Sequence, residues 1–218
     1  MKCAREGYPF IIICLILAIL TWLATLVFGL WMSIIAILLS MLTILVAWFF
    51  RDPERDQPVD QDIVIAPADG KILAIDEIHE PSFFDGPCRR ITIFLSIFNV
   101  HIQRAPIEGK VIHKYYKNGE YLAAWNEKAS ENNEQSSLGI ATQYGSVMVR
   151  QIAGLIARRI VTYPELEAVL EPGERIGLIR FGSRVDLFIP THWKIECAVG
   201  DKALGGVTVL AKPLPLSN

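Results

Sequence analysis

Hydrophobic residues dominate the first fifty positions of the chain. From residue 7 to residue 50 the sequence holds no Asp, Glu, Lys or Arg, over 44 residues rich in Ile, Leu, Val, Trp and Phe. One membrane-spanning helix needs about 20 apolar residues, so this stretch is long enough for two, and Gly29 beside Trp31 marks the expected turn. A signal peptide would have a shorter apolar region of about 7–15 residues. We therefore predict a membrane anchor of two apolar helices over residues 1–50; one crossing or a re-entrant hairpin stays open.

Positive charges flank this anchor on both sides. Lys2 and Arg5 precede it, and Arg51 and Arg55 follow it. Because positive charge tends to stay cytoplasmic, we expect both ends of the hairpin, and the domain that follows, on the cytoplasmic side of the cell membrane. The two later arginines are equally suited to contact anionic lipid phosphates. A charged, proline-punctuated linker over 51–62 leads into a domain over 63–218.

Short β-type runs follow the linker. We expect strands at 63–66, 70–75, 90–95, 109–115, 144–153, 176–181, 185–189 and 206–211. Turns rich in Gly, Pro, Asp and Asn separate them, which favours a sandwich or barrel over βαβ units. We predict a mainly β protein, with one sandwich-like or barrel-like domain after the transmembrane hairpin. Residues 96–100 are expected to form a helical turn, and residues 130–137 a polar loop within the longest irregular connection, 118–140, which is either functional or disordered.

Charge and cysteine usage exclude some classes of function. Residues 51–218 carry 19 Lys and Arg and 22 Asp and Glu, a net charge of 19 − 22 = −3. Nucleic-acid binding requires a basic face, which this balance does not favour. The spacing of the four cysteines, at 3, 14, 88 and 197, matches neither a disulfide framework nor a zinc site. We expect a reducing, cytosolic setting and no metal.

A Gly-Ser pair interrupts an apolar run near the C-terminus. Gly182 and Ser183 lie between the runs 176–181 and 185–189, a pattern that predicts two strands hinged at the pair. Glycine permits strained backbone conformations, so the serine hydroxyl can approach the preceding carbonyl and attack its own peptide bond. This attack needs a base and a polarised carbonyl. Taken alone, however, the residues favour the structural interpretation, in which His101 is a core histidine and Asp69 is a turn aspartate that caps its own loop.

Four further blocks accompany the Gly-Ser pair in a fixed order. They are APADGK at 66–71, NVHIQRAP at 99–106, IARRI at 156–160 and VGDK at 199–202. With the Gly-Ser site, they resemble the proenzymes of the phosphatidylserine decarboxylase family, in their short, archaeal-like form. The resemblance covers nearly everything after residue 60. Each block alone is weak, but their order and spacing together are specific.

The resemblance implies a pyruvoyl-dependent decarboxylase that cleaves itself between Gly182 and Ser183. Ser183 would attack the Gly182 carbonyl with His101 as its base, while Asp69 orients the histidine, so that a Ser-His-Asp set acts on the enzyme itself. The resulting ester would break by elimination, and residue 183 would lose ammonia and end as a covalent pyruvoyl group. The large fragment, 1–182, and the small fragment, 183–218, would stay associated as a heterodimer.

The resemblance also implies a substrate. The pyruvoyl carbonyl would form a Schiff base with the amine of phosphatidylserine in the membrane and draw the electrons left by departing carbon dioxide. His101 would return a proton to give phosphatidylethanolamine. Arg104 is the candidate for the lipid phosphate or carboxylate, and Asn133 and Glu134 match an Asn-Glu pair near the active site of the family. Two other classes stay open: a membrane-anchored serine hydrolase with an intact Ser183, and a non-enzymatic, membrane-tethered β domain.

Overall fold

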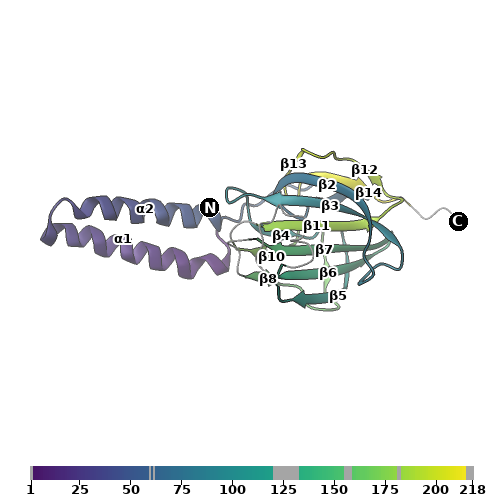
Figure 1. The fold of residues 1–218 in the computed structure, drawn as a ribbon, viewed down its shortest axis with the longest axis horizontal. Helices are drawn as coiled ribbons and strands as arrows, with labels where there is room; N and C mark the ends of the chain where they lie inside the picture. Colours follow the sequence, from purple (N-terminus) through teal and green to yellow (C-terminus); the bar gives the residue numbers. More distant parts are fainter. Residues whose placement is uncertain are drawn as a thin grey trace. The chain divides into compact units, whose positions relative to one another are not determined.

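The chain forms two compact units, which span residues 1–54 and 55–218. The computed structural model describes residues 2–58, 60, 62–119, 133–154, 159–180 and 183–214. The first unit is helical and the second is built from β-strands (Figure 1). The predicted mainly β class with an N-terminal helical hairpin is therefore confirmed.

The first unit is a pair of apolar helices. A short 3-10 turn, η1 (Arg5–Gly7), leads into α1 (Tyr8–Phe28), and α2 (Met32–Phe49) follows after a tight turn. The turn contains Gly29 at φ 89°, a left-handed conformation that favours glycine. Both helices are long and apolar enough to cross a membrane. Apolar side chains are exposed at near-consecutive positions, such as Ile12, Ile13 and Leu15, so neither helix has the polar face that water would require.

Polar side chains inside these helices are satisfied locally. The hydroxyls of Thr21 and Thr43 donate to carbonyls one turn earlier, at 2.7 and 2.8 Å. Trp22 Nε1 on α1 donates to Ser40 Oγ on α2 at 3.2 Å and so links the two helices. Because hydrocarbon offers no hydrogen-bond partners, this internal pairing suits an apolar environment.

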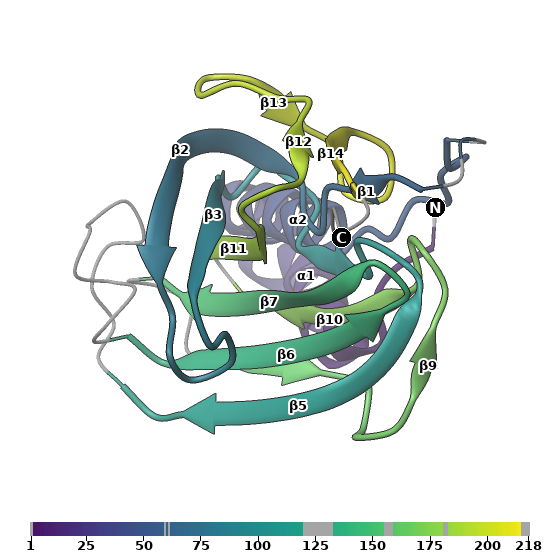
Figure 2. The ribbon, with the colours of Figure 1, turned by 90° about the vertical axis from the view of Figure 1, so that its right-hand side faces the viewer.

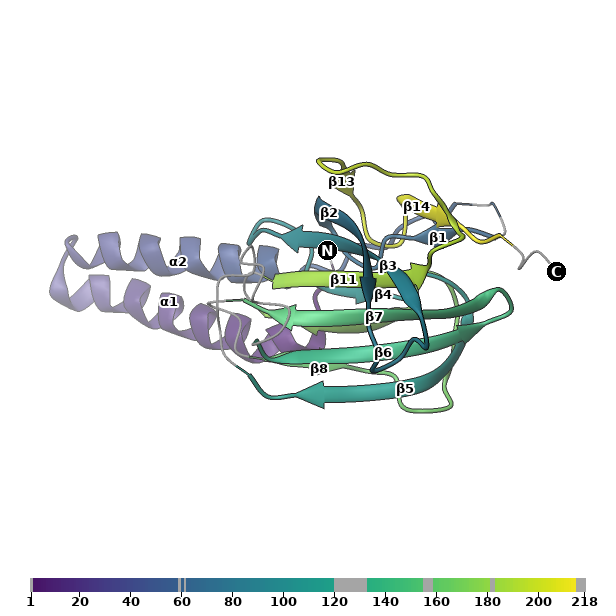
Figure 3. The ribbon, with the colours of Figure 1, turned by 45° about the vertical axis from the view of Figure 1, so that its right-hand side comes forward.

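The second unit contains three antiparallel sheets in the part of the chain that the structure describes. The largest has the order β13-β2-β3-β11-β7-β6-β5-β9, and it curls strongly (Figures 2 and 3). Two smaller sheets have the orders β4-β10-β8 and β1-β14-β12. The strands are β1 (Val64–Ile65), β2 (Gly70–His79), β3 (Pro87–Leu95), β4 (Ile102–Arg104), β5 (Gly109–Lys117), β6 (Gln135–Thr142), β7 (Gly145–Ala153), β8 (Ile160–Thr162), β9 (Val169–Leu170), β10 (Arg175–Ile179), β11 (Ser183–Pro190), β12 (Lys194–Ile195), β13 (Lys202–Ala203) and β14 (Val209–Lys212).

Strand β11 lies in the middle of the large sheet and is buried on both faces. Val185, Leu187 and Ile189 alternate toward the main hydrophobic core. On the opposite face, Arg184 pairs with Asp186, with 2.7 Å between Nε and Oδ1, and also donates to Thr92 Oγ1 at 3.0 Å. A buried charge is tolerated when it has a partner. Polar and apolar residues of β11 are therefore buried alike, from Ser183 to Ile189.

The expected turn after β3 is present, whereas the expected polar loop is wrong at its end. Residues 96–99 form a single turn, in which the N–H of Asn99 donates to the Ser96 carbonyl at 3.0 Å, and Asn99 Oδ1 accepts from the backbone N–H and the hydroxyl of Ser96, at 2.9 and 2.7 Å. Strand β6 begins at Gln135. It therefore includes the end of the expected polar loop, residues 135–137, and the end of the expected irregular connection, residues 135–140. Polarity misled the prediction here because Ser136 and Ser137 are buried with hydrogen-bond partners. Residues 120–132 lie outside the described residues.

Candidate active site

Ser183 is the first residue of β11, and its side chain lies inside the fold. Its register partners are Leu95 on β3 and Ala153 on β7. It shares a strand face with Val185 and Leu187, so it points toward the core. The side chain is fully buried, and Oγ has no hydrogen-bond partner among the described residues. A buried hydroxyl without a partner is costly, which marks this position as functional. Gly182 lies outside the described residues.

The flanking strands belong to different sheets. β10, which ends at Ile179, lies in the sheet β4-β10-β8, whereas β11 lies in the large sheet. The expected pair of strands around the Gly-Ser site therefore exists, but the two strands do not form a hairpin. The site lies where the chain crosses from one sheet to the other.

His101 lies in the same part of the fold as Ser183. It follows β3 by six residues, and β3 ends at Leu95, the register partner of Ser183. Its carbonyl accepts the backbone N–H of Ile179, four residues before Ser183, at 3.4 Å. The ring is 1% exposed, and Nδ1 lies 2.9 Å from the carbonyl oxygen of Asn99. A carbonyl only accepts, so Nδ1 donates, and in the neutral ring the lone pair is then on the buried Nε2.

Asp69 is tied to the backbone beside His101. Its Oδ2 accepts the N–H of Val100 at 3.4 Å, and its Oδ1 accepts the N–H of Gly205 at 2.9 Å. Both oxygens also accept from Arg55, which forms a bidentate pair with distances of 2.5 and 2.9 Å. The carboxylate therefore reaches His101 through the preceding peptide, while Arg55 balances its charge. Of the two roles that the sequence left open for Arg55, lipid contact or flanking charge, the structure shows neither, because its guanidinium faces Asp69.

Asn133 and Glu134 lie immediately before β6, and only strand β7 separates β6 from the strand of Ser183. Asn133 Nδ2 donates to the carbonyl of Ala153 at 2.7 Å, and the carbonyl of Glu134 accepts the N–H of the same alanine at 2.9 Å. Since Ala153 is the register partner of Ser183, both residues border the site. The Glu134 carboxylate is buried and accepts the hydroxyl of Tyr116 at 2.8 Å.

Arg104 lies on β4 with only 5% of its surface exposed. Its Nη1 donates to the carbonyl of Gly173 at 3.0 Å. The aliphatic part packs on Gly206, where an added Cβ would lie 2.7 Å from Arg104 Cδ. Gly206 follows Gly205, which contacts Asp69, so Arg104 lies beside the Asp69 cluster.

Comparison with known proteins identifies the family. The family model for phosphatidylserine decarboxylase matches residues 42–211. A curated phosphatidylserine decarboxylase proenzyme of Syntrophus aciditrophicus is 45% identical over 208 residues, which cover 95% of each chain. Another, of Symbiobacterium thermophilum, is 41% identical over 210 residues, which cover 96% of this chain and 94% of the relative. The chain belongs to the phosphatidylserine decarboxylase family.

Sequence reasoning missed several residues around this decarboxylase-type site. Arg55 was read as part of the linker, although its guanidinium completes the Asp69 cluster. Gln103 and Gln151 are buried and hydrogen-bonded to each other at 2.8 Å. Gln103 lies two positions after His101, within the block 99–106, and Gln151 lies two positions before Ala153, but each stands beside an arginine and nothing in the sequence connects the two.

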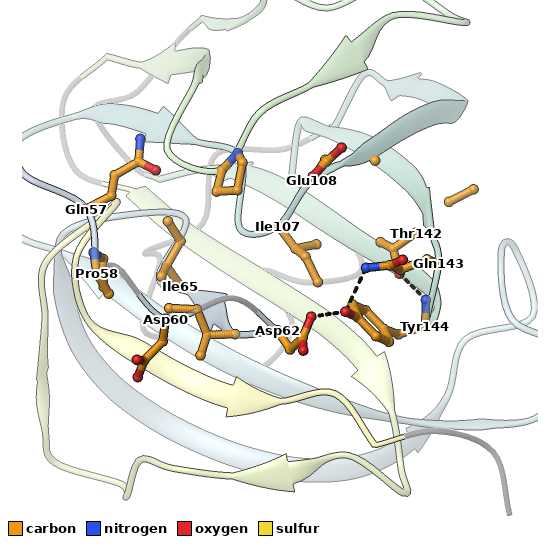
Figure 4. Close-up of a pocket in the computed structure, with 14 residues that line it drawn as sticks. Gln57, Pro58, Asp60, Asp62, Ile65, Ile107, Glu108, Thr142, Gln143 and Tyr144 are labelled. Carbon is orange, nitrogen blue, oxygen red and sulfur yellow. Dashed lines mark hydrogen bonds between the residues drawn. The ribbon is translucent and has the colours of Figure 1, made fainter.

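A cavity of about 540 Å³ lies elsewhere in the domain (Figure 4). Its walls include Asp62, Glu108, Ile65 and Tyr144, whose hydroxyl donates to Asp62. Tyr144 precedes Gly145, where β7 begins, whereas Ala153, beside Ser183, is where β7 ends. The cavity therefore lies at the opposite end of β7 from the decarboxylase-type site. Within the described residues, no group of three His, Cys, Asp or Glu side chains could hold a metal ion.

Proposed function

We propose that this protein is a self-cleaving proenzyme that decarboxylates phosphatidylserine to phosphatidylethanolamine. Its membership of the family supports the reaction class. The observation that carries the proposal is the buried Ser183 hydroxyl, which has no hydrogen-bond partner among the described residues and begins a strand next to the segment that holds His101. A serine hydrolase acting on an external ester would need an accessible hydroxyl, so full burial of Ser183 favours attack on the chain itself.

Self-cleavage uses atoms of this chain alone, apart from one water molecule. The Ser183 oxygen adds to the Gly182 carbonyl carbon, and the peptide nitrogen leaves, so that an ester replaces the amide. Elimination then breaks the bond between Cβ and Oγ of residue 183. Residues 1–182 end in a carboxylate that keeps the serine oxygen, and residue 183 becomes dehydroalanine. Water then displaces ammonia from that residue and leaves a pyruvoyl group at the start of 183–218.

His101 acts as the base in this proposal. The Nδ1–H is held by the Asn99 carbonyl at 2.9 Å, so Nε2 is the nitrogen that takes the serine proton. Asp69 supports the histidine through the N–H of Val100, and Arg55 forms an ion pair with the Asp69 carboxylate inside the fold. The set therefore works as a Ser-His-Asp arrangement in which the acid holds the loop and not the ring.

The mature site would carry its pyruvoyl group at position 183, between Leu95 and Ala153. The buried and unpartnered surroundings of the Ser183 side chain fit such a group, because Cβ of residue 183 becomes a methyl group that needs no hydrogen-bond partner. Once formed, the group supplies a carbonyl that withdraws the electrons released with carbon dioxide. His101 returns a proton to the substrate carbon. Asn133 and Glu134 contact the serine headgroup, and Arg104 binds its anionic part, because a guanidinium stays charged at every working pH.

The two fragments stay together after cleavage. The small fragment contributes β11, which pairs with β3 and β7 of the large fragment, and β13 and β14, which pair with β2 and β1. The helical unit anchors the enzyme in the cell membrane beside its lipid substrate. A cytoplasmic catalytic unit is part of this proposal, and the positive charges of Lys2, Arg5 and Arg51 beside the hairpin support it.

The test is the mass of the full chain purified in detergent. We expect fragments 1–182 and 183–218, the second beginning with a pyruvoyl group, and release of carbon dioxide from phosphatidylserine in mixed micelles. Ser183→Ala should stay a single inactive chain, because no oxygen remains to receive the acyl group. Ser146→Ala, on β7 at the far end of the sheet, is the matched control and should be processed normally. An intact wild-type chain that hydrolyses esters, or one with no activity, would overturn the proposal.

A further inference from the structure

Four polar side chains form a continuous hydrogen-bonded chain between the two sheets that border Ser183. Gln103 Nε2 donates to the His101 carbonyl at 2.9 Å, and Gln151 Nε2 donates to Gln103 Oε1 at 2.8 Å. Thr162 Oγ1 lies 2.7 Å from Gln151 Oε1 and 2.8 Å from Ser136 Oγ. The first two side chains are 0% and 3% exposed. We call this set, Gln103, Gln151, Thr162 and Ser136, the amide chain.

The His101 carbonyl at one end of the amide chain determines which group donates in every hydrogen bond of the set. The His101 carbonyl only accepts, so the Gln103 amide must present its NH₂ to it and its oxygen to Gln151. Gln151 must then present its NH₂ to Gln103 and its oxygen to Thr162. Thr162 donates its one proton there, so the proton between Thr162 and Ser136 comes from the serine. One arrangement satisfies all four groups, which rigidifies a buried network.

The fold provides a specific place for the Gln151 amide. Gln103, Gly177 and Thr162 are neighbours in one row across the sheet β4-β10-β8. Gln151 extends from β7 of the large sheet and bonds to both outer members of that row, Gln103 and Thr162. The amide passes over Gly177, where an added Cβ would lie 2.8 Å from Gln151 Nε2. Space for this bridge therefore depends on the missing side chain of Gly177.

The amide chain also adjoins the reacting serine. Gln151 pairs in register with Val185, and Ala153, two residues later on the same face, pairs with Ser183. The amide chain therefore connects the surroundings of Ser183, the proposed nucleophile, with the backbone of His101, the proposed base. Packing alone would be served as well by apolar residues, because buried hydrogen bonds contribute little net stability.

We propose that the amide chain positions His101 for proton transfer during self-cleavage, with Gln103 and Gln151 as positioning residues that act through the His101 carbonyl. This inference rests on the proposed function, in which His101 is the base. The competing role is purely structural: the amide chain would join the two sheets and affect processing only as much as it affects stability.

The first experiment measures the rate of self-cleavage after cell-free synthesis of the full chain into lipid nanodiscs. Gln103→Met and Gln151→Met keep side-chain length but remove the hydrogen bonds. Because a displacement of about 1 Å at a reacting group can cost about 100-fold in rate, we expect Gln103→Met to slow cleavage by about that factor and Gln151→Met by about tenfold. Val147 is buried on the same face of β7 as Gln151, so Val147→Ala serves as a control for lost stability. Gln143 is exposed, so Gln143→Met serves as a control for replacing glutamine by methionine. Neither should slow cleavage measurably.

A double-mutant cycle separates positioning from stability. Gln103→Met combined with Gln151→Met should cleave no more slowly than Gln103→Met alone, because the second substitution removes a link that is already broken. Gln103→Met combined with Val147→Ala should cleave at the rate of Gln103→Met alone, because Val147→Ala has no measurable effect of its own on cleavage. Multiplied effects in the pair of glutamine substitutions, as expected for independent sites, would overturn the proposal.

The second experiment observes His101 without any cleavage. In the uncut Ser183→Ala protein, ¹⁵N chemical shifts of the imidazole should report one tautomer, with the proton on Nδ1. Gln103→Met in that background should give a mixture of tautomers, while Val147→Ala should not. An unchanged tautomer together with a cleavage rate equal to that of Val147→Ala would exclude positioning. A wild-type chain that never cleaves would overturn the proposed function instead, and the tautomer measurement would still decide whether the amide chain holds His101.

Discussion

Arg55 and Asp69 form a bidentate ion pair inside the β unit, with side chains 14% and 6% exposed. The backbone of Gly205 completes the pair: its carbonyl accepts from Arg55 at 2.5 Å, and its N–H donates to Asp69 at 2.9 Å. The same carboxylate accepts the N–H of Val100, the residue before His101. One arginine therefore balances the charge that holds the histidine segment in place.

Removing one partner of this pair should destabilise the protein strongly. Arg55→Gln leaves a buried carboxylate without a counter-charge, and such changes typically cost about 3–5 kcal/mol. The double variant Arg55→Gln/Asp69→Asn should recover much of that loss. Denaturant unfolding in the uncut Ser183→Ala background measures the free energies. Glu165→Gln removes an ion pair whose carboxylate is 82% exposed, and it should cost less than about 1 kcal/mol. Equal losses in the single and double variants would refute the account of a balanced pair.

Truncation should separate the anchor from the chemistry. A protein starting at Arg51 keeps Arg55 and should cleave itself, while it loses membrane partition and most activity on bilayer substrate. A protein starting at Asp56 lacks Arg55 and should cleave much more slowly, because Asp69 loses its counter-charge. Mass spectrometry and vesicle co-sedimentation provide the readouts. If the longer truncated protein folds without cleaving, the helical unit is required for processing.

His101 and Arg104 should fail in different ways. His101→Ala removes the proposed base and proton donor, so it should impair self-cleavage, and any pyruvoyl enzyme that forms should turn over slowly. Arg104→Ala should spare cleavage and mainly raise KM. Cleavage is scored by mass and turnover by released carbon dioxide. Efficient processing of His101→Ala would move the role of base to another residue, such as His192.

Acid stability should depend on Glu80. Its Oε2 lies 2.7 Å from Arg150 Nη1. Burial raises the pKa of Glu80, but hydrogen bonds from Arg150 and Ser82 and the charge of Arg150 outweigh it, so the pKa lies below the ordinary value of 4.5. The stabilisation is therefore complete above the unfolded-state pKa and is lost as pH falls through the lower folded-state pKa.

Thermal unfolding of the uncut protein should show this dependence. Glu80→Gln should be less stable at pH 7, and its deficit should shrink as pH falls below about 4.5, the ordinary carboxyl value. Ser82→Ala, which removes only the weaker hydrogen-bond partner, is the graded control. A deficit that stays constant with pH would contradict the assignment.

The sequence predicted the features that depend on local patterns. The apolar hairpin, the turn at Gly29 and most long strands follow from hydropathy and glycine placement, and the structure contains them. Strand β6 escaped prediction because Ser136 and Ser137 find partners only in the folded protein, Thr162 and Arg150. Its burial is a property of tertiary contacts, which periodicity does not record.

The site was predictable only where a residue belongs to a sequence block. Ser183, His101 and Asp69 stand in such blocks, and the fold brings their segments together. Their partners do not stand out: Arg55 lies among other charged residues, and Gln151 lies 48 positions from Gln103. From the sequence we expect Asp69 to orient the imidazole of His101. The contact that the structure has, with the N–H of Val100, could not be predicted because it depends on how two loops meet.

The central place of β11 has a consequence for how the enzyme can be made. The strand pairs along its whole length with β3 and along most of it with β7, and its first residue follows the proposed cut. Cleavage there removes a covalent link without removing a register pair, so the mature protein keeps a fold that was reached as one molecule. Once denatured, it would have to regain that fold by a bimolecular reaction between two fragments, one of them lacking the middle strand of its own sheet. Its persistence would then be set by the rate of unfolding, whereas the precursor can return to its fold unaided.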